Sequence, residues 1–145
     1  MKIVLQRVKS ASVSVCDKIC GQIDNGYLVL VGFGADDTES DCERLAEKII
    51  NLRVFSDENG KINLNLADVN GSLLIVSQFT LYADCRKGNR PNFIMAAKPD
   101  KAESLYNYFI SCCQKRTANS VETGIFGADM EVCLINDGPF TIILE

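Results

Sequence analysis

Polar and apolar residues alternate along much of this chain, which is the pattern of half-buried β-strands. Ser10–Val15 alternates strictly, and Ile3, Leu5 and Arg7 share one face of a strand by the same period of two. We therefore expect two strands within residues 2–15. Arg7 lies on an otherwise apolar face, so it needs either a stem that reaches solvent or a dedicated acceptor, and the pattern leaves both open.

Two segments joined by the turn at residues 24–26 predict strands over 19–23 and 27–33, and the alternation of residues 63–66 predicts another. Leu73–Val76 has four apolar residues in succession, which indicates a central strand covered on both faces. Polar residues follow at once in Ser77–Leu81. Because polar groups at the end of a buried strand need hydrogen-bond partners, this segment is a candidate for chemistry.

Two segments have helical periodicity instead. The first has an apolar stripe at Cys42, Leu45, Ala46, Ile49 and Leu52. Thr38 and Asp41, which precede it, resemble a capping box. The second begins at Pro99, which suits a first helical turn, and its stripe is Ala102, Leu105, Tyr106, Phe109 and Cys113. Together with the strands, these helices predict one compact α+β domain over residues 1–145.

The C-terminal segment contains two apolar runs, Met130–Ile135 and Phe140–Leu144, separated by Asn136–Pro139. Asp-Gly favours a hairpin turn, so we expect a terminal β-hairpin here. Pro139, however, removes a backbone donor where the second strand begins, and an X-Pro bond adopts the cis form at modest cost. An ordinary turn with a proline at its edge and a functional cis proline both fit this stretch.

Composition narrows the possible chemistry. The 145 residues include no histidine, which excludes Ser-His-Asp and Cys-His catalysis and histidine-ligated metals. The seven cysteines show no second pair at zinc-site spacing, so we expect free thiols, no metal and no cofactor. No apolar run approaches the roughly 20 residues of a membrane span, and the N-terminus turns polar too soon for a signal peptide. We expect a cytoplasmic protein without membrane contact.

The formal charge of −4 argues against non-specific nucleic-acid binding, which rests on phosphate neutralisation. A local basic patch is nevertheless present in the long loop of residues 84–98, which holds Arg86, Lys87 and Arg90 beside Phe93. Such a loop is either a phosphate-binding element or a solvated surface loop.

Ser77–Leu81 and Asn136–Thr141 together closely resemble the two signature motifs of the D-aminoacyl-tRNA deacylases. The resemblance extends over the whole chain, including the segments Gln6–Val8, Arg90–Phe93 and Gly124–Met130. One departure is Phe140, where the family more often has valine. The resemblance implies an α+β fold with mixed and antiparallel barrel-like β-sheets and two main helices.

It further implies an editing hydrolase that cleaves the ester of D-aminoacyl-tRNA, and of glycyl-tRNA mischarged on tRNA(Ala), as a cytoplasmic homodimer. Its partners would be tRNA and a second copy of the chain, with no DNA. By the resemblance, Gly138 and Pro139, joined by a cis peptide bond, form a chiral selector that enters the partner's active site. Arg7 and Asn136 would support this selector.

The same resemblance implies roles for the remaining site residues. The catalytic segment would be Ser77, Gln78, Phe79 and Thr80, with a backbone N–H near Phe79 stabilising negative charge on the ester carbonyl. The residues expected to hold the terminal adenosine are Phe126, Gly127, Met130 and Ala102. Those expected near acceptor-stem phosphates are Arg86, Lys87 and Arg90.

Thr80 is a candidate nucleophile, but no residue identifiable in the sequence would activate it. The resemblance assigns assistance instead to the 2′-hydroxyl of the terminal ribose. Two alternatives stand beside this interpretation. One is a non-enzymatic module that binds tRNA acceptor ends, and the other is an esterase that uses Thr80 or Ser77 as its nucleophile.

Overall fold

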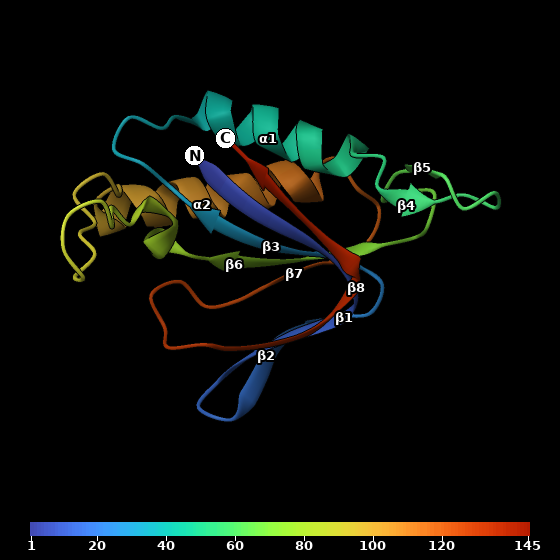
Figure 1. Ribbon diagram of the computed structural model, residues 1–145, viewed down its shortest axis with the longest axis horizontal. Coiled ribbons are helices and arrows are strands. Elements are labelled where there is room, and N and C mark those ends of the chain that lie inside the picture. Colours follow the sequence, from blue (N-terminus) through green and yellow to red (C-terminus); the bar gives the residue numbers. More distant parts are fainter.

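A six-stranded mixed sheet organises the computed structural model, which describes residues 1–145 (Figure 1). Its strands are β1 (Lys2–Val15), β2 (Lys18–Ile23), β3 (Gly26–Gly32), β6 (Ser72–Ser77), β7 (Val121–Thr123) and β8 (Glu131–Leu144). They follow the order β2-β1-β3-β6-β7, and β8 pairs with the other edge of β1. A separate two-stranded sheet consists of β4 (Phe55–Ser56) and β5 (Ile62–Leu64).

The N-terminal segment forms one continuous strand, β1, so the expectation of two strands there is wrong. Its first half pairs with β3 and its second half with β2, while β8 runs antiparallel along its opposite edge. Ile3 and Leu5 in its first half lie in the larger core, whereas Val8, Ala11 and Val13 lie in the smaller one. The two halves of one strand therefore serve different cores.

Two helices cover one face of the curved sheet, α1 (Glu39–Asn51) and α2 (Pro99–Gln114) (Figure 1). Their predicted apolar stripes are confirmed, since all but Leu52 of those residues are buried in the larger core. Asp41 also accepts a hydrogen bond from the backbone N–H of Thr38 at 3.0 Å, as the capping box predicted. Neither helix has the length and apolar content needed to cross a bilayer.

The centre of the sheet is β6, which is parallel to both β3 and β7. Its run Leu73–Val76 is buried on both faces, as predicted. On the face away from the helices, the sheet curls around a smaller core, formed by Val8, Ala11, Val13, Ile23, Leu28, Leu74 and Val76. The predicted fold, a single compact α+β domain with a barrel-like mixed sheet and two main helices, is therefore confirmed.

The expected terminal hairpin is absent, because β8 is a single strand that pairs with β1 on both sides of the Gly-Pro unit. Asn136 pairs with Val8 and Thr141 pairs with Gln6. Four residues of β8, 137–140, therefore lie opposite the single residue Arg7 of β1. The extra residues form a bulge, which suits a proline that cannot donate to the ladder. The Gly138–Pro139 peptide bond within this bulge is cis.

Candidate active site

A pocket of about 580 Å³ opens where β3 and β6 end. Its lining is mostly apolar. It comes from the ends of β3 and β6, the start of the 3-10 helix η1 (Phe79–Tyr82), the loop before α2 together with the start of α2, and the segment that leads into β8. A pocket with apolar walls and a few polar groups is the usual form of a small-molecule site.

Ser77, Gln78 and Phe79 line this pocket at the end of β6. Gln78 is held to the neighbouring strand by a hydrogen bond from its backbone N–H to the Val31 carbonyl at 2.7 Å. The Phe79 ring is 58% exposed and makes an edge contact with the Phe93 ring, with centroids 5.0 Å apart. The two rings therefore border the mouth of the pocket.

Thr80, the fourth residue expected in the catalytic segment, is not among the residues that line the pocket. Its hydroxyl oxygen accepts a hydrogen bond from the Gln78 side-chain amide at 2.6 Å. An amide N–H is a donor, so this contact orients the hydroxyl but does not remove its proton. The structure supplies Thr80 with no general base.

All four residues expected to hold the adenosine also line the pocket: Ala102, Phe126, Gly127 and Met130. The Phe126 ring packs against the Tyr106 ring at 5.7 Å, and the Tyr106 hydroxyl donates to the Ile75 carbonyl at 2.8 Å. Burial raises the pKa of Tyr106 well above its usual range, so the hydroxyl remains a donor. This part of the lining is thereby fixed to the centre of the sheet.

The far end of η1 is anchored by Tyr82. Its hydroxyl donates to Asp37 Oδ2 at 3.0 Å, and the same oxygen accepts the Gly34 backbone N–H at 2.6 Å. Gly34 lies so close to the Tyr82 ring that a Cβ there would approach it to 2.7 Å. Burial, reinforced by the Asp37 carboxylate, raises the pKa of Tyr82. These three residues position η1, and none of them was predicted as a site residue from the sequence.

Arg7, which is 9% exposed, holds the bulge in β8. Its Nε donates to the Asp137 carbonyl at 3.0 Å and lies 3.1 Å from Asp137 Oδ2, while Nη1 bonds the Val54 carbonyl. The guanidinium also lies over the Phe140 ring, 4.8 Å from its centroid, and near the Phe55 ring. Arg7 thus has dedicated acceptors and does not reach for solvent.

Asn136 closes the bulge from its other side. Its Oδ1 accepts the Phe140 N–H at 2.7 Å, and its Nδ2 donates to the Phe140 carbonyl at 3.1 Å. Gly138, enclosed between them, has φ +147°, and a Cβ there would lie 2.8 Å from the Phe140 nitrogen. Only glycine fits this position without a shift of the backbone.

The bulge and the pocket of the same chain lie apart. The nearest part of β8 that lines the pocket is Val132, and Gly138 follows six residues later along the strand. At roughly 3.3 Å per residue, this separates them by about 20 Å. Gly138, Pro139, Arg7 and Asn136 are brought together with one another, and none of them lines the pocket.

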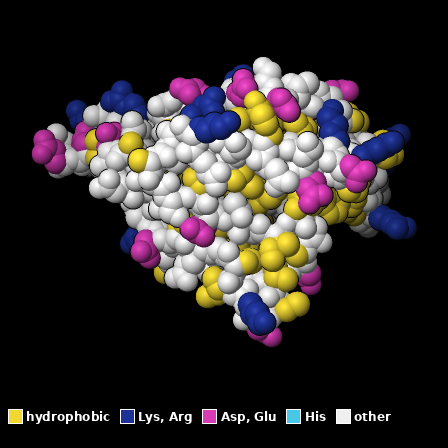
Figure 2. Space-filling view, turned by 180° about the vertical axis from the view of Figure 1, so that it is seen from behind, with side chains coloured by type: hydrophobic (Ala, Val, Ile, Leu, Met, Phe, Trp, Pro, Cys, Tyr) yellow, Lys and Arg dark blue, Asp and Glu magenta, His cyan; other side chains and the backbone are white.

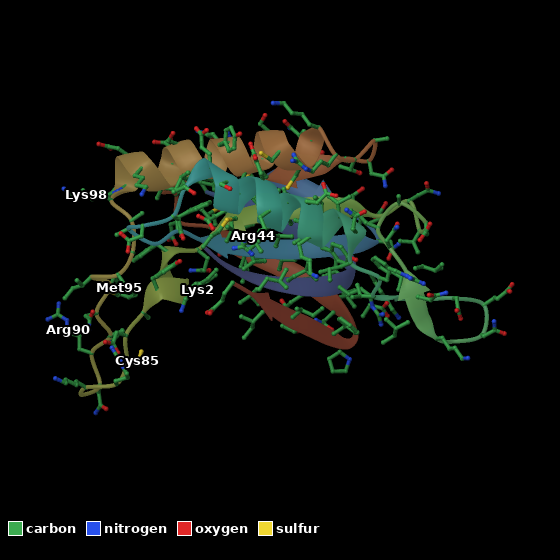
Figure 3. All side chains as sticks on the ribbon, turned by 90° about the horizontal axis from the view of Figure 1, so that it is seen from above. Lys2, Arg44, Cys85, Arg90, Met95 and Lys98 are labelled. Carbon is green, nitrogen blue, oxygen red and sulfur yellow. The ribbon has the colours of Figure 1, made fainter.

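The basic residues of the long loop lie outside the pocket. Figure 3 shows Arg90 and Cys85 on this loop, which extends away from the body of the molecule. Arg86 makes a two-pronged ion pair with Asp84, with both nitrogen–oxygen distances at 2.8 Å. These hydrogen bonds hold the pKa of Asp84 below its usual range. Lys87 and Arg90 form no ion pair, so they are the free cations among the three predicted.

Comparison with known proteins decides the family. The model of the family described as D-Tyr-tRNA(Tyr) deacylase matches residues 4–145. The D-aminoacyl-tRNA deacylase of Thermosipho africanus is 58% identical over 145 residues, which cover 100% of this chain and 97% of the relative. That of Bacillus cytotoxicus is 57% identical, with 100% and 99% covered. The chain belongs to the D-aminoacyl-tRNA deacylase family.

Solved structures agree on the fold of this deacylase. A protein named c-Myc DNA Unwinding Element Binding Protein is 43% identical, with a TM-score of 0.94, and the match covers 100% of this chain and 98% of that one. A probable eukaryotic D-amino acid tRNA deacylase superposes with a TM-score of 0.84 at 19% identity, covering 99% and 97%. The family predicted from the paired motifs is confirmed, and the chain is a hydrolase of D-aminoacyl-tRNA.

The sequence analysis did not single out Asp129, the one charged residue among those that line this deacylase's pocket. It lies inside Gly124–Met130, a segment already noted for its resemblance, and its charge is the signal that could have singled it out. Asp37 and Tyr82 had no such signal, because they meet only through the folding of segments 45 residues apart.

Proposed function

We propose that the deacylase works as a homodimer in which Gly138–Pro139 of one subunit enters the partner's pocket and rejects L-aminoacyl esters. The observation that carries this proposal is the placement of the bulge. It is held rigidly by Arg7 and Asn136, yet it lies about 20 Å along β8 from the pocket of its own chain. Because this rigid element lies far from the pocket of its own chain, we infer that it acts on the pocket of the partner subunit.

Selection by such an element is steric. A wall of backbone at the α-carbon of the substrate clashes with an L side chain, whereas a D side chain points away from it. Rejection by a clash exceeds the roughly 1–3 kcal/mol that hydrophobic fit alone provides. Glycine has no side chain to reject, so the same wall admits glycyl-tRNA, including glycine mischarged on tRNA(Ala).

Dimerisation has its own support in the exposed side of β8. This strand pairs with β1 along one edge only, and it exposes Leu134, Ile135 and Ile143, the last at 69%. Figure 2 shows exposed apolar side chains gathered in patches on one face of the molecule. A long edge strand with exposed apolar residues is a site for pairing with another chain.

Catalysis in this proposal belongs largely to the substrate. The 2′-hydroxyl of the terminal ribose assists hydrolysis, while the backbone N–H of Phe79 stabilises negative charge on the ester carbonyl. Phe79 is the first residue of η1, where a backbone N–H has no partner within the helix. The Thr80 hydroxyl, which has no base beside it, argues against an esterase that uses Thr80 as its nucleophile.

The proposal also assigns residues to the adenosine and to the phosphates of the tRNA. Phe126, Gly127, Met130 and Ala102 hold the terminal adenosine, for which an aromatic ring and a thioether suit the purine face. Lys87 and Arg90 contact acceptor-stem phosphates, while Arg86 serves mainly to brace the loop through Asp84. We place the protein in the cytoplasm with tRNA as its nucleic-acid partner and no DNA.

One assay tests the proposal directly. D-Tyr-tRNA and L-Tyr-tRNA are incubated with the protein in EDTA, and its mass is measured by sedimentation. We expect the D-ester alone to be cleaved, by a dimer. Cleavage of both esters, or an active stable monomer, would contradict the cross-subunit selector. Competition of D-Tyr-tRNA cleavage by duplex DNA, which we expect to be absent, tests the exclusion of DNA.

A further inference from the structure

The guanidinium of Arg7 lies over two aromatic rings. Its Cζ is 4.8 Å from the centroid of the Phe140 ring and 5.9 Å from that of the Phe55 ring. A guanidinium within about 6 Å of a ring centroid is attracted by the negative face of the ring, most strongly where water is excluded. Because Arg7 is buried, the nearer ring, that of Phe140, attaches it to the bulge at a second point beside the Asp137 carbonyl.

Phe140 is itself held at both its backbone and its side chain. The side-chain amide of Asn136 accepts from the Phe140 N–H at 2.7 Å and donates to the Phe140 carbonyl at 3.1 Å. The Phe140 side chain is half-buried and packs against the larger core. The ring is therefore a fixed surface against which the guanidinium of Arg7 rests.

Hydrogen bonds alone leave the plane of this guanidinium free to rock. Arg7 is bound through Nε to the Asp137 carbonyl and through Nη1 to the Val54 carbonyl. Two such contacts fix two points of a planar group, which can still rotate about the line that joins them. The Phe140 ring restricts that rotation, because the guanidinium loses its attraction when it leaves the face of the ring.

Gly138 borders both of these side chains. A Cβ at Gly138 would lie 3.1 Å from Phe140 Cβ and 3.4 Å from Arg7 Nη2. Side chains at such distances leave no free space beside the Gly138 backbone. If the guanidinium rocked away from the ring, space would open there and the Gly-Pro unit could move into it.

We propose that Phe140 is a positioning residue of the selector, because its ring sets the plane of the Arg7 guanidinium and thereby the position of Gly138–Pro139. This inference rests on the proposed role of Gly138–Pro139 in rejecting L-aminoacyl esters. Steric repulsion rises steeply as atoms approach, so a small displacement of the wall admits more of the L-ester. The D-ester, whose side chain points away from the wall, is cleaved as before.

The experiment removes the ring but keeps an apolar side chain. Phe140→Leu and Phe140→Met lack a ring, whereas Phe140→Tyr retains one. The matched control is Ile142→Val, because Ile142 also lies on β8 and packs against the same core. For each protein, kcat/KM is measured on D-Tyr-tRNA and L-Tyr-tRNA, with thermal unfolding as a check of folding.

A double variant tests whether Phe140 acts through Arg7. Phe140→Leu is combined with Arg7→Ala, and the ratio of D- to L-ester cleavage is compared with that of Arg7→Ala alone. A residue that acts through Arg7 has little further effect once the guanidinium is lost. In this background we expect Phe140→Leu to change the ratio by less than about twofold.

In the otherwise wild-type protein, we expect Phe140→Leu and Phe140→Met to lower the ratio about fivefold. The fall should come from faster cleavage of the L-ester, with kcat/KM on the D-ester changed by less than about twofold. Phe140→Tyr and Ile142→Val should keep the wild-type ratio.

Three results would overturn the assignment of Phe140. They are an unchanged ratio in the two ringless variants, an equal fall in Phe140→Tyr or Ile142→Val, and an undiminished effect of Phe140→Leu in the Arg7→Ala protein. If the wild type cleaved D- and L-esters equally, the selector itself would be refuted, and this assignment with it.

Discussion

Arg7 donates a hydrogen bond from Nε to the Asp137 carbonyl at 3.0 Å, immediately before Gly138 in the bulge of β8. The two residues are 130 positions apart in the chain, and their contact joins the middle of β1 to the Gly-Pro unit. Because Arg7 also bonds the Val54 carbonyl, one buried guanidinium fixes the bulge to two other segments.

Replacement of Arg7 by alanine should loosen this bulge. The substitution leaves the Asp137 and Val54 carbonyls without a buried partner, at about 1–3 kcal/mol each. We expect the free energy of unfolding in urea to fall by about 3 kcal/mol and the ratio of D- to L-ester cleavage to drop at least tenfold. Arg53→Ala is the matched control, since Arg53 is an exposed arginine that bonds the Asn63 carbonyl. An unchanged D/L ratio in Arg7→Ala would show that Arg7 does not hold the selector.

Thr80→Ala tests the nucleophile. The Thr80 hydroxyl is bound by the Gln78 amide and has no base beside it, so we expect kcat on the D-ester to stay within about fivefold of wild type. Loss of a true covalent nucleophile typically costs a factor of a thousand or more. A loss of that size in a folded Thr80→Ala protein, measured by single-turnover deacylation, would restore Thr80 to the nucleophile role.

Tyr82→Phe tests the anchor of η1. It removes the hydroxyl that donates to Asp37 but keeps the ring that packs on Gly34, so we expect a loss of about 1 kcal/mol in stability. The displaced η1 should lower kcat several-fold with little change in KM. The matched control is Tyr108→Phe, which removes a hydroxyl bonded to Glu43 on the exposed side of α2. If both variants had wild-type kcat, the anchor would have no part in positioning the site.

Features of the fold that depend on local spacing were predicted correctly, whereas a feature that depends on pairing between distant segments was not. The stripes of α1 and α2 and the buried run of β6 were correct, because each is set by local spacing and burial. The terminal hairpin was wrong because Asp137-Gly138 is a strong local turn signal, whereas the pairing of β8 with β1 on both sides of it is non-local.

The candidate site shows the same division. Ser77–Phe79 and the segment around Phe126 line the same pocket. Their resemblance to family motifs predicted this meeting, whereas their separation along the sequence gave no sign of it. Arg86 was predicted to contact phosphate because it lies among basic residues, but its guanidinium is already paired with the carboxylate of Asp84, two residues earlier. The meeting of Tyr82 with Asp37 depends on the whole fold, and no local pattern reports it.

Stability should fall at high pH because two buried thiols keep their protons in the folded state. Burial raises the pKa of Cys42 and of Cys113 from 9.0 to about 12. Both pKa values are raised by folding, so the thiols contribute fully below about pH 9, where neither state ionises. Above that, the unfolded chain loses protons first, and each thiol costs about 1.4 kcal/mol per pH unit up to about pH 12.

Urea unfolding with a reductant at pH 8 and pH 10 measures this slope. Cys113→Ala should lower stability at both pH values and flatten the slope between them, whereas Cys85→Ser, at an exposed thiol, should leave it unchanged. A Cys113→Ala slope equal to that of the wild type would show that Cys113 does not titrate in this way.

Mixing two inactive subunit types tests most directly whether Gly138–Pro139 acts on the partner's pocket. Gly138→Ala places a Cβ 2.8 Å from the Phe140 nitrogen, so the Gly-Pro unit must shift; we expect the shifted unit to obstruct the partner's pocket and abolish cleavage of the D-ester there. Gly88→Ala is its control, because Gly88 also has a positive φ, +67°, but open space around it. The second subunit type is Ala128→Trp, in which a large ring fills the pocket.

Each variant alone should be inactive. If equal amounts are unfolded together and refolded, half of the dimers pair one subunit of each kind, and each of these has one intact pocket facing an intact Gly138. We therefore predict recovery of about a quarter of the wild-type D-Tyr-tRNA deacylation rate. No recovery, in a mixture shown by mass spectrometry to contain the mixed dimer, would contradict the account.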